Sequence, residues 1–588
     1  MIPELTDDQR TLVEEVAESA FVTACPGAGK TRAVVARYLR RVEEEPRKGI
    51  ALVSFTNAAV EEVRNRCVDR HDAMKAPHFV GTFDSFVARY LVAPLYRAVF
   101  KVSPRLVQSW DDIGLSSFRL PVKARVPDVE LSWFDFDAWG RAELRPERIP
   151  RKAGPTLTGM LTGTRRAEAE YRAGAIHQGL LKVGTLTCDT SRRLARAWTE
   201  DVAMRAVIQP LMANRFAEII VDEAQDCGED ELVILQFLLE CGIRVLMIGD
   251  LDQSIYEFRR AVPERVKEFG AGLPHQLSLS DNFRSTPAIC AINSSLRVSG
   301  EPDRASGRHA GSTVPVHVLG YRRAEDIAPQ VLSVVTENGL PASQTIILSH
   351  GGADALRAVG AAAADLVGGN RVAAVVDAGH KLRTGSEGKA RIAALERVER
   401  YLIEAVAAGS LEELSLDAVL DANGIERRWL RDTTIRLCQS LEPWDKTASG
   451  FSAELRSRVA QLDWPPQLAV NCSHFRAPTT EVWKGLLKAE AASELLSSTI
   501  HGVKGQEFPA VALTLPTRMR KDATGRTVLD DWEFGFQTEA RRVLYVGASR
   551  AQALLMLVVP AVQTERVTKL LSRDAVPYQV WPVMIGGF

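Results

Sequence analysis

The segment Ala24 to Thr31, with the sequence ACPGAGKT, places glycines, a lysine and a threonine at a spacing suited to phosphate binding. It matches the pattern [AG]-x4-G-K-[ST] and lies between the apolar run 21–23 and a helical pattern. Glycines let backbone N–H groups curl around phosphates, and the N-terminus of the following helix adds its positive dipole end. Lys30 would reach the β- and γ-phosphates, and the Thr31 hydroxyl would ligate Mg²⁺. The predicted nucleotide-phosphate site comprises Ala24, Cys25, Pro26, Gly27, Ala28, Gly29, Lys30, Thr31 and Arg32.

Two adjacent carboxylates, Asp222 and Glu223, directly follow the apolar run 217–221. A carboxylate pair at the carboxyl end of a parallel strand suits metal and water chemistry. We expect Asp222 to hold Mg²⁺, directly or through water, and Glu223 to orient and deprotonate an attacking water. An Asp-Glu pair after a strand is common by chance, so its significance here comes from the phosphate-binding pattern upstream.

Four further side chains are candidates for contacts with a nucleotide or a nucleic acid. Gln9 precedes the phosphate loop, and its amide can offer a donor and an acceptor together to an adenine edge; an exposed, solvated glutamine is the alternative. Gln253 follows the apolar run 245–248 and is placed to sense a γ-phosphate. Tyr256 and Phe258 are candidates for stacking on unpaired bases, with core packing as the alternative.

Apolar runs that alternate with helical patterns predict the strands that position these residues. We expect buried parallel strands, and hence an α/β fold, from the runs 50–55, 217–221, 245–248, 344–348, 511–515 and 554–559. Two stretches interrupt the alternation. Residues 92–205 are less regular and rich in Trp, Phe, Pro and Arg, whereas residues 373–480 are mainly amphipathic helix.

Composition limits the classes of protein that fit this chain. With 73 basic and 74 acidic residues the net charge is −1, so any basic surface for a nucleic acid must be local. The eight cysteines include no CxxC pair, which argues against zinc and clustered iron–sulfur sites and suits a reducing compartment. The N-terminus lacks the features of a secretory signal, and the most apolar run is too short for a bilayer. We therefore expect a cytoplasmic protein without a membrane partner.

Nine motifs occur in order along the chain: the glutamine segment 5–9, ACPGAGKT, SFTNAAVEEVRNR, GTFDSF, VDEAQD, GDLDQSIYEFR, DNFRS, TIHGVKGQEF and RRVLYVGASRA. Their order and spacing resemble the UvrD/Rep/PcrA branch of superfamily 1 helicases. The resemblance implies two RecA-like lobes, each a parallel sheet flanked by helices, with ATP in the cleft between them. It also implies a mainly helical insertion in each lobe. The implied organisation is a first lobe of 1–91 and 206–274 with the insertion 92–205, and a second lobe of 275–372 and 481–588 with the shortened insertion 373–480.

The resemblance also implies roles for individual residues. Arg284 and Arg550 look like the arginine fingers of the second lobe, and Arg259 looks like their counterpart in the first lobe. Phe283 corresponds to the aromatic residue that stacks on adenine, and Glu507 to the acidic residue near the ribose. By the same resemblance, Gln9 would contact adenine, and Gln253 would link the nucleotide to the DNA-binding loops. The positions that would contact single-stranded DNA are Phe55, Thr82, Tyr256, Phe258 and His501.

Three departures from the family pattern bear on the expected activity. Asp84 stands where the family commonly has histidine, which places an acid near the expected DNA path. Phe258 replaces a usual tryptophan and offers a smaller stacking platform. The insertion 373–480 is shorter than the family usually carries. We therefore expect a weak unwinder that becomes effective with a partner.

The implied function is a DNA-stimulated, Mg²⁺-dependent ATPase that translocates on single-stranded DNA, 3′ to 5′ as in the family. Two roles remain open: DNA repair or replication restart, and anti-phage defence with a separate nuclease, as in compact UvrD-like members of Gabija-type systems. The alternative from another class is a nucleotide-gated DNA-end-binding module that regulates a partner nuclease without processive unwinding. RNA as the track also remains open.

Overall fold

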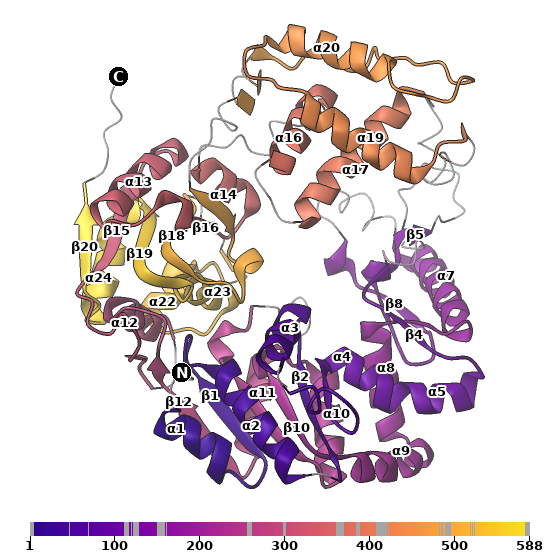
Figure 1. Cartoon of the computed structure of the whole chain (residues 1–588), viewed down its shortest axis with the longest axis vertical. Helices are drawn as coiled ribbons and strands as arrows, with labels where there is room; N and C mark the ends of the chain where they lie inside the picture. The colour runs from indigo at the N-terminus through magenta and orange to yellow at the C-terminus, as the bar shows by residue number, and fades with distance from the viewer. Residues whose placement is uncertain are drawn as a thin grey trace. The chain divides into compact units, whose positions relative to one another are not determined.

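The computed structural model divides the chain into two compact units, residues 1–284 with 299–310 and residues 285–298 with 311–588 (Figure 1). The second unit therefore begins later than the limit at residue 274 that the motifs suggest. The structure describes residues 5–45, 47–68, 70–110, 117–118, 120, 129–149, 159, 161–255, 262–297, 301–359, 370–383, 388–406, 420, 423–480, 482–483, 486–487, 495–517, 519, 521–522 and 524–582.

The first unit is built on a six-stranded sheet in which every neighbouring pair of strands is parallel. Parallel strands are buried on both faces, and all six residues of the strand from Gly49 to Ser54 are buried accordingly. The spatial order is β12 (His275–Leu279), β1 (Ala20–Ala24), β11 (Arg244–Gly249), β10 (Phe216–Asp222), β2 (Gly49–Ser54) and β3 (Phe79–Thr82).

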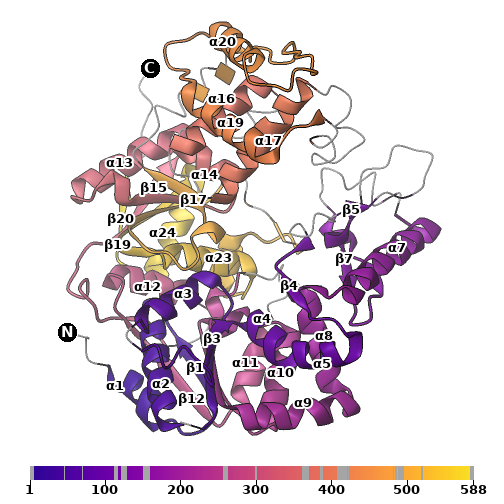
Figure 2. The same ribbon diagram turned by 45° about the vertical axis from the view of Figure 1, so that its right-hand side comes forward.

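Different helices cover the two faces of this sheet (Figure 2). In β2, Ile50 and Leu52 pack into one core while Ala51 and Val53 pack into the other, as the two-residue period of a strand requires. The first core includes the π-helix η1 (Thr11–Glu15), α2 (Lys30–Glu44) and α3 (Asn57–Arg66). The second includes α4 (Phe83–Phe86), α8 (Cys188–Glu200), α9 (Val202–Arg215), α10 (Glu229–Glu240) and α11 (Pro263–Ala271).

The predicted insertion 92–205 folds into helices and short strand pairs. A separate apolar core packs Trp133 and Phe134 against Ala169 and Ala173 of α7 (Gly163–Lys182). The short strands were not expected from the sequence, since each has only two or three residues. Other elements here include α5 (Ala93–Phe100) and the pairs β4 (Arg105–Val107) with β9 (Thr185–Thr187), β5 (Ser117–Phe118) with β6 (Val129–Glu130), and β7 (Phe134–Phe136) with β8 (Ala142–Leu144).

The second unit contains another six-stranded parallel sheet, and the two sheets together confirm the predicted α/β fold class with two RecA-like lobes. Its strands are β17 (Leu496–Thr499), β16 (Thr345–Ser349), β18 (Phe508–Thr514), β19 (Ala551–Pro560), β15 (Val316–Tyr321) and β20 (Tyr578–Trp581), in spatial order. The helices of this unit include α12 (Pro287–Leu296), α13 (Ile327–Glu337), α14 (Gly352–Ala358), α22 (Val528–Phe534), α23 (Glu539–Ala548) and α24 (Thr564–Arg573).

The predicted helical segment 373–480 is helical in its described part and has an apolar core, which includes Leu402 and Phe451 (Figure 1). Its helices include α16 (Arg371–Arg383), α17 (Gly388–Glu404), α19 (Arg427–Ser440) and α20 (Ala448–Ala460). In the described part of the whole chain, we find no helix with the length and apolar character needed to cross a bilayer.

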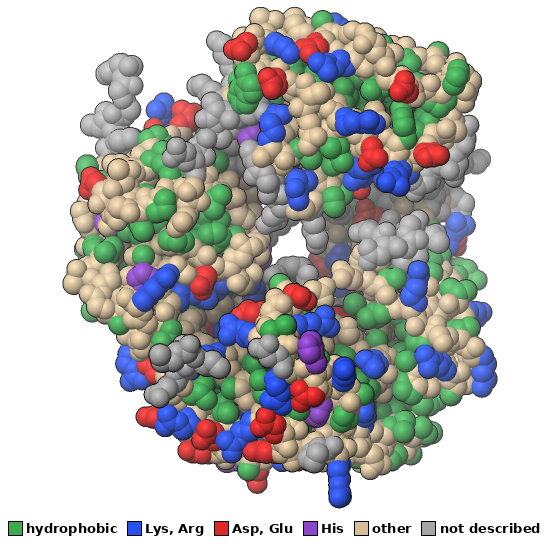
Figure 3. All heavy atoms as spheres, viewed as in Figure 1, with side chains coloured by type: hydrophobic (Ala, Val, Ile, Leu, Met, Phe, Trp, Pro, Cys, Tyr) green, Lys and Arg blue, Asp and Glu red, His purple; other side chains and the backbone are tan. Residues whose placement is uncertain are grey.

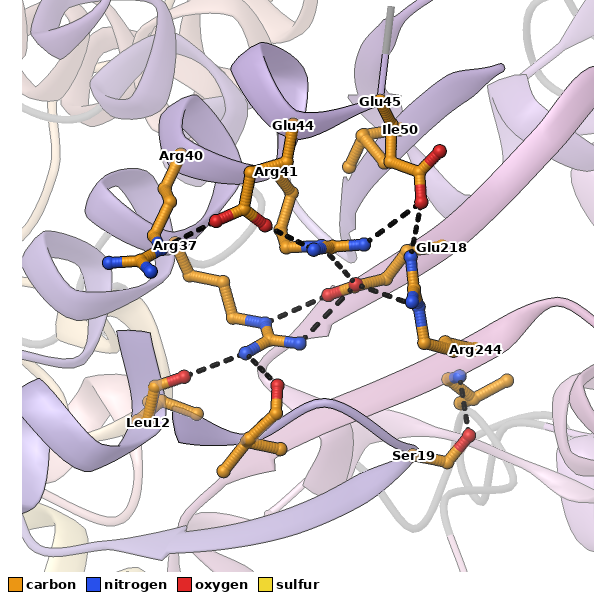
Figure 4. A network of polar contacts seen from close by, with 12 residues as sticks. Leu12, Ser19, Arg37, Arg40, Arg41, Glu44, Glu45, Ile50, Glu218 and Arg244 are labelled. Carbon is orange, nitrogen blue, oxygen red and sulfur yellow. Dashed lines mark hydrogen bonds and ion pairs between the residues drawn. The ribbon is translucent and has the colours of Figure 1, made fainter. Parts of the chain in front are cut away.

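A buried carboxylate, Glu218 of β10, ties the first sheet to the helix that follows the phosphate loop (Figure 4). Its side chain is fully buried and pairs with three guanidinium groups: Arg37 Nε at 2.8 Å, Arg41 Nε at 3.0 Å and Arg244 Nε at 3.4 Å. Arg37 Nη1 also donates to the carbonyl oxygens of Leu12 and Val16, both at 2.8 Å. This network therefore connects α2, β11 and the N-terminal helical segment to β10.

Glu218→Gln should destabilise the first unit by about 3–5 kcal/mol, because removing one partner of a buried ion pair leaves an uncompensated charge. Urea unfolding followed by far-UV circular dichroism measures the loss. Glu168→Gln is the matched control: Glu168 pairs with Arg172 of the same helix at 2.7 Å, but its side chain is 47% exposed and lies outside the network. The control should lose less than about 1 kcal/mol. Equal losses in the two variants would show that the network does not stabilise the fold.

Candidate nucleotide-binding site

The phosphate-binding loop joins β1 to α2 and has left-handed backbone at two glycines. Gly27 has φ +72° and Gly29, the residue before α2, has φ +71°. A Cβ at residue 27 would lie 2.5 Å from Arg284 Cβ and 2.8 Å from Asn282 Oδ1, and a Cβ at residue 29 would lie 2.9 Å from Gln9 Nε2. Both the backbone conformation and the lack of space therefore require glycine.

Backbone hydrogen bonds hold the loop against segments that are distant in sequence. Cys25 N donates to the carbonyl of Leu279 at the end of β12, at 2.9 Å, and Phe283 N donates to the carbonyl of Gly27 at 3.0 Å. Within the loop, Ala28 N donates to Cys25 O at 3.2 Å. Residues 279–284 thus support one side of the loop.

Gln9 supports the loop from the N-terminal side. Thr6 caps α1 (Asp7–Arg10), and its backbone N–H donates to Gln9 Oε1 at 3.3 Å. Gln9 Nε2 donates to the carbonyl of Ala28 at 2.8 Å, and the side chain is 1% exposed. The alternative of a solvated glutamine is therefore wrong, whereas the contact with adenine stays a prediction.

The other predicted phosphate-binding residues lie around the start of α2. Ala24, Cys25, Pro26 and Ala28 are buried, whereas Lys30, Thr31 and Arg32 form the first turn of α2 and are half-buried. Backbone N–H groups in the first turn of a helix lack intrahelical partners, so this end of α2 is suited to a phosphate.

The predicted carboxylate pair lies at the carboxyl end of β10, two strands from β1 in the sheet. Asp222 is 2% exposed, and burial, together with the neighbouring Glu223 carboxylate, raises its pKa to about 7. The Lys30 ammonium opposes this shift, so the phosphate-loop lysine acts on Asp222 electrostatically. A buried carboxylate with a raised pKa is stabilised in its charged form by a nearby cation.

This arrangement fits a magnesium ion that is shared with a nucleotide. In the described part of the chain, no three His, Cys, Asp or Glu side chains gather as a metal-binding group. Mg²⁺ is usually held by one or two carboxylates together with substrate phosphates and water, rather than by an all-protein cage. Asp222 and Thr31 carry oxygen atoms of the kind that such a shared ion takes, and their role as its ligands stays a prediction.

Glu223 has a backbone conformation that is unusual for a side-chain-bearing residue, with φ 57° and ψ 42°. Its backbone N–H donates to Asp222 Oδ1 at 2.9 Å, and its carboxylate accepts a hydrogen bond from Gln225 Nε2. Strained backbone of this kind persists at functional sites because the surrounding structure enforces it. The two neighbouring carboxylates thus accept hydrogen bonds from different donors, a backbone N–H for Asp222 and a side-chain amide for Glu223.

Gln253 lies in the turn after β11, close to the carboxylate pair. Its Nε2 donates to Asp250 Oδ2 at 2.7 Å, and the Asp250 N–H donates to Gln225 Oε1 at 3.0 Å. Three residues that we did not predict as site residues, Gln225, Asp250 and Asn282, therefore connect the predicted ones. Each lies within a motif quoted above, but only the folded sheet shows what it contacts.

The predicted DNA-contacting residues of the first unit lie at the ends of β2 and β3. Phe55 stacks on Phe83, with ring centroids 5.7 Å apart and planes 8° from parallel. Thr82 Oγ1 accepts from Ser85 N at 3.1 Å and caps α4. Tyr256, Phe258 and Arg259 lie outside the described residues.

Asp84 does not present an unpaired acid next to Thr82. Its carboxylate pairs with Arg192 of α8 at 2.5 Å, and Arg192 also pairs with Glu231 at 3.1 Å. The acid expected near the DNA path is therefore neutralised within its own unit.

Two predicted residues of the second unit, Glu507 and Arg550, lie where β18 begins and where β19 follows α23, whereas His501 follows β17. The Arg550 side chain is 2% exposed and donates to the carbonyls of Val546 at 3.1 Å and Gln506 at 3.3 Å. Glu507 Oε1 accepts from Gln552 Nε2 at 2.8 Å. His501 lies 5.9 Å from His350, centroid to centroid. Arg284 and Phe283, assigned to the second lobe on the motifs, lie instead beside the phosphate loop of the first unit.

A parallel sheet with a phosphate loop after one strand and an Asp-Glu pair after another defines a nucleotide-binding site of the P-loop type. The family model described as the UvrD/REP helicase N-terminal domain matches residues 5–126 and 158–273. These matched residues include the phosphate loop and the carboxylate pair. The match confirms the resemblance to UvrD/Rep helicases.

Curated relatives agree with this assignment. The chain is 28% identical to DNA helicase II of Escherichia coli over 50% of this chain and 40% of that protein. It is 25% identical to the ATP-dependent DNA helicase UvrD2 of Mycobacterium tuberculosis over 95% of this chain and 79% of that protein. It is 22% identical to the ATP-dependent DNA helicase srs2 of Schizosaccharomyces pombe over 94% and 71%, respectively. The chain thus spans 40% of the length of the DNA helicase II proteins it matches.

Gly27→Ala should abolish nucleotide binding, because the new methyl group meets Arg284 Cβ at 2.5 Å in a backbone conformation that disfavours it. Gly242→Ala is a matched control: Gly242 has φ +76°, but an added Cβ would meet no atom within 4 Å among the described residues beyond its chain neighbours. The control should lose about 1–2 kcal/mol of stability and bind nucleotide normally. Binding of a fluorescent ATP analogue measures both. Normal binding by Gly27→Ala would contradict the steric account of the loop.

Proposed function

We propose that this chain is an ATP-dependent DNA helicase or translocase that hydrolyses Mg-ATP and moves 3′ to 5′ on single-stranded DNA. The observation that carries the proposal is the pairing of a glycine-constrained phosphate loop with the Asp222–Glu223 pair in one parallel sheet. The three relatives described above are DNA helicases by name, which supports DNA as the substrate class.

In this proposal each residue of the first unit has a separate task. Backbone N–H groups of the loop and Lys30 bind the phosphates, and Gln9 holds the loop in place through Ala28. A magnesium ion held by Thr31 and Asp222 would offset the charge on the β- and γ-phosphates. Glu223 orients the attacking water and accepts its proton as the bond to the γ-phosphorus forms.

Two arginines are proposed to neutralise charge that develops on the γ-phosphate. Support for Arg284 comes from its place beside Gly27. Support for Arg550 comes only from the motif it belongs to. Its guanidinium here donates to carbonyl groups of its own unit. Arg550 would exchange these carbonyl bonds for phosphate oxygens when the two lobes close on ATP. Closure with ATP and release after hydrolysis would provide the stepping cycle.

The proposed DNA track relies on local contacts rather than on a global positive charge. Figure 3 shows basic and acidic side chains intermixed over the visible face, in keeping with the net charge of −1. Phe55 and Thr82 follow neighbouring strands of the sheet, and His501 is the proposed contact in the second unit. Stacking on aromatic side chains suits a motor because every base has a π-face.

The proposal includes a dependence on a partner, such as a separate nuclease, for effective duplex separation. The motivating feature is the short second insertion, whose described helices pack around a core of their own. Repair and anti-phage defence are both compatible with such a partner. A nearly neutral protein has little long-range attraction to DNA. A partner that tethers the protein to DNA would raise the effective concentration of DNA at the site.

Lys30→Ala should abolish ATP hydrolysis and weaken nucleotide binding, whereas Glu223→Gln should keep nucleotide binding and lose turnover by about 100-fold or more. Lys30 is proposed to bind the phosphates and Glu223 to activate water. The first variant should therefore lose ATP affinity as well as turnover, and the second only turnover. Steady-state hydrolysis with single-stranded DNA and equilibrium binding of ATP measure the difference.

Matched controls are Lys267→Ala and Glu264→Gln, because both side chains are exposed on α11 of the same unit. Both controls should hydrolyse ATP at the rate of the unaltered protein. Near-normal turnover by Glu223→Gln would remove this residue from the role of general base.

A further inference from the structure

The amide of Gln225 lies between the carboxylate pair and the turn that carries Gln253. Its side chain is fully buried. Nε2 donates to Glu223 Oε2, and Oε1 accepts from the backbone N–H of Asp250 at 3.0 Å. One side chain therefore contacts two loops that follow neighbouring strands, β10 and β11.

The contact continues from Asp250 to Gln253. Asp250 Oδ2 accepts from Gln253 Nε2 at 2.7 Å, and Asp250 Oδ1 accepts from Asp252 N at 3.2 Å. Asp250 and Gln253 are 4% and 5% exposed, so these bonds are shielded from water. An unbroken series of hydrogen bonds and one backbone link thus runs from the Glu223 carboxylate to Gln253.

The structure keeps space for this amide at Gly249. A Cβ at that residue would overlap Gln225 Oε1 and would lie 3.1 Å from the backbone nitrogens of Ala224 and Gln225. Gly249 is the last residue of β11 and lies outside the left-handed backbone region, so here glycine is required by space alone. The tight fit leaves the Gln225 amide little freedom to move.

The chemistry of the bridge is specific to an amide. Gln225 must donate to a carboxylate and accept from a backbone N–H at the same time, which neither a leucine nor a glutamate side chain can do. The left-handed backbone of Glu223 fixes the direction in which its side chain leaves the chain. The hydrogen bond from Gln225 Nε2 then fixes the position of the Glu223 carboxylate.

We propose that Gln225 is a positioning residue that orients the Glu223 carboxylate and links its position to the turn 250–253. The inference rests on the proposed function, in which Glu223 is the general base, and on the expectation from the sequence that Gln253 senses the γ-phosphate. A displacement of Gln253 moves Asp250, and the Asp250 N–H then moves the amide that holds Glu223. Hydrolysis is thereby coupled to the segment that follows residue 253.

Two variants break the bridge in different ways. Gln225→Leu keeps the side-chain volume and loses both hydrogen bonds, whereas Gly249→Ala keeps Gln225 and displaces its amide. Both should lower kcat for DNA-stimulated ATP hydrolysis by about 100-fold, the effect expected for a misplaced catalytic group, with ATP affinity within about threefold. Gly272→Ala is the matched control, because the nearest atom to its added Cβ lies at an ordinary 3.4 Å. It should keep full kcat.

A double-mutant cycle separates this role from general support of the fold. If Gln225 and Gln253 act through one bridge, Gln225→Leu combined with Gln253→Ala should lose no more kcat than the worse single variant. Multiplicative losses, or a full kcat in Gln225→Leu while the unaltered protein hydrolyses ATP, would overturn the inference and leave the proposed function intact. No hydrolysis by the unaltered protein with DNA and Mg²⁺ would overturn the proposed function and this inference together.

Discussion

The phosphate loop has no room for a side chain at Gly27, and the rest of the site depends on that constraint. Because residue 27 is a glycine with left-handed backbone, Asn282 and Arg284 can lie directly against the loop. The same packing allows Phe283 N to reach the Gly27 carbonyl and Cys25 N to reach Leu279 O. The loop is therefore supported by the edge strand β12 and by Gln9 rather than by its own sequence alone.

The opposite end of the first sheet stabilises the same geometry. Glu218 and Asp222 lie on one strand, β10, and the Arg37 and Arg41 partners of Glu218 lie on α2, the helix that begins with Lys30. The buried ion network thus fixes β10 against α2 at one end, while the nucleotide site uses the other end. The Lys30 ammonium acts on the Asp222 carboxylate because α2 and β10 are held together.

Most central strands and the contiguous motifs could be predicted from the sequence, whereas the central strand β15, the edge strands and the long-range contacts could not. β2, β10 and β19 are mainly apolar because both of their faces are buried. β12, β17 and β20 lie at or near sheet edges with half-exposed, more polar sequences, so they gave no such pattern. Asn282, Gln225 and Asp250 act only through loops that the sheet brings together, and no spacing along the chain reveals those contacts.

The central claim is that hydrolysis at this site drives movement along single-stranded DNA, and the arrival time of the protein at a labelled DNA end tests it most directly. The purified protein is mixed in stopped flow with ATP, Mg²⁺ and oligothymidylates of increasing length that carry a fluorophore at one end. The account predicts an arrival time that grows in proportion to length when the fluorophore is at the 5′ end, and no such lag at the 3′ end. ATP hydrolysis with an arrival time independent of length at both ends would contradict it.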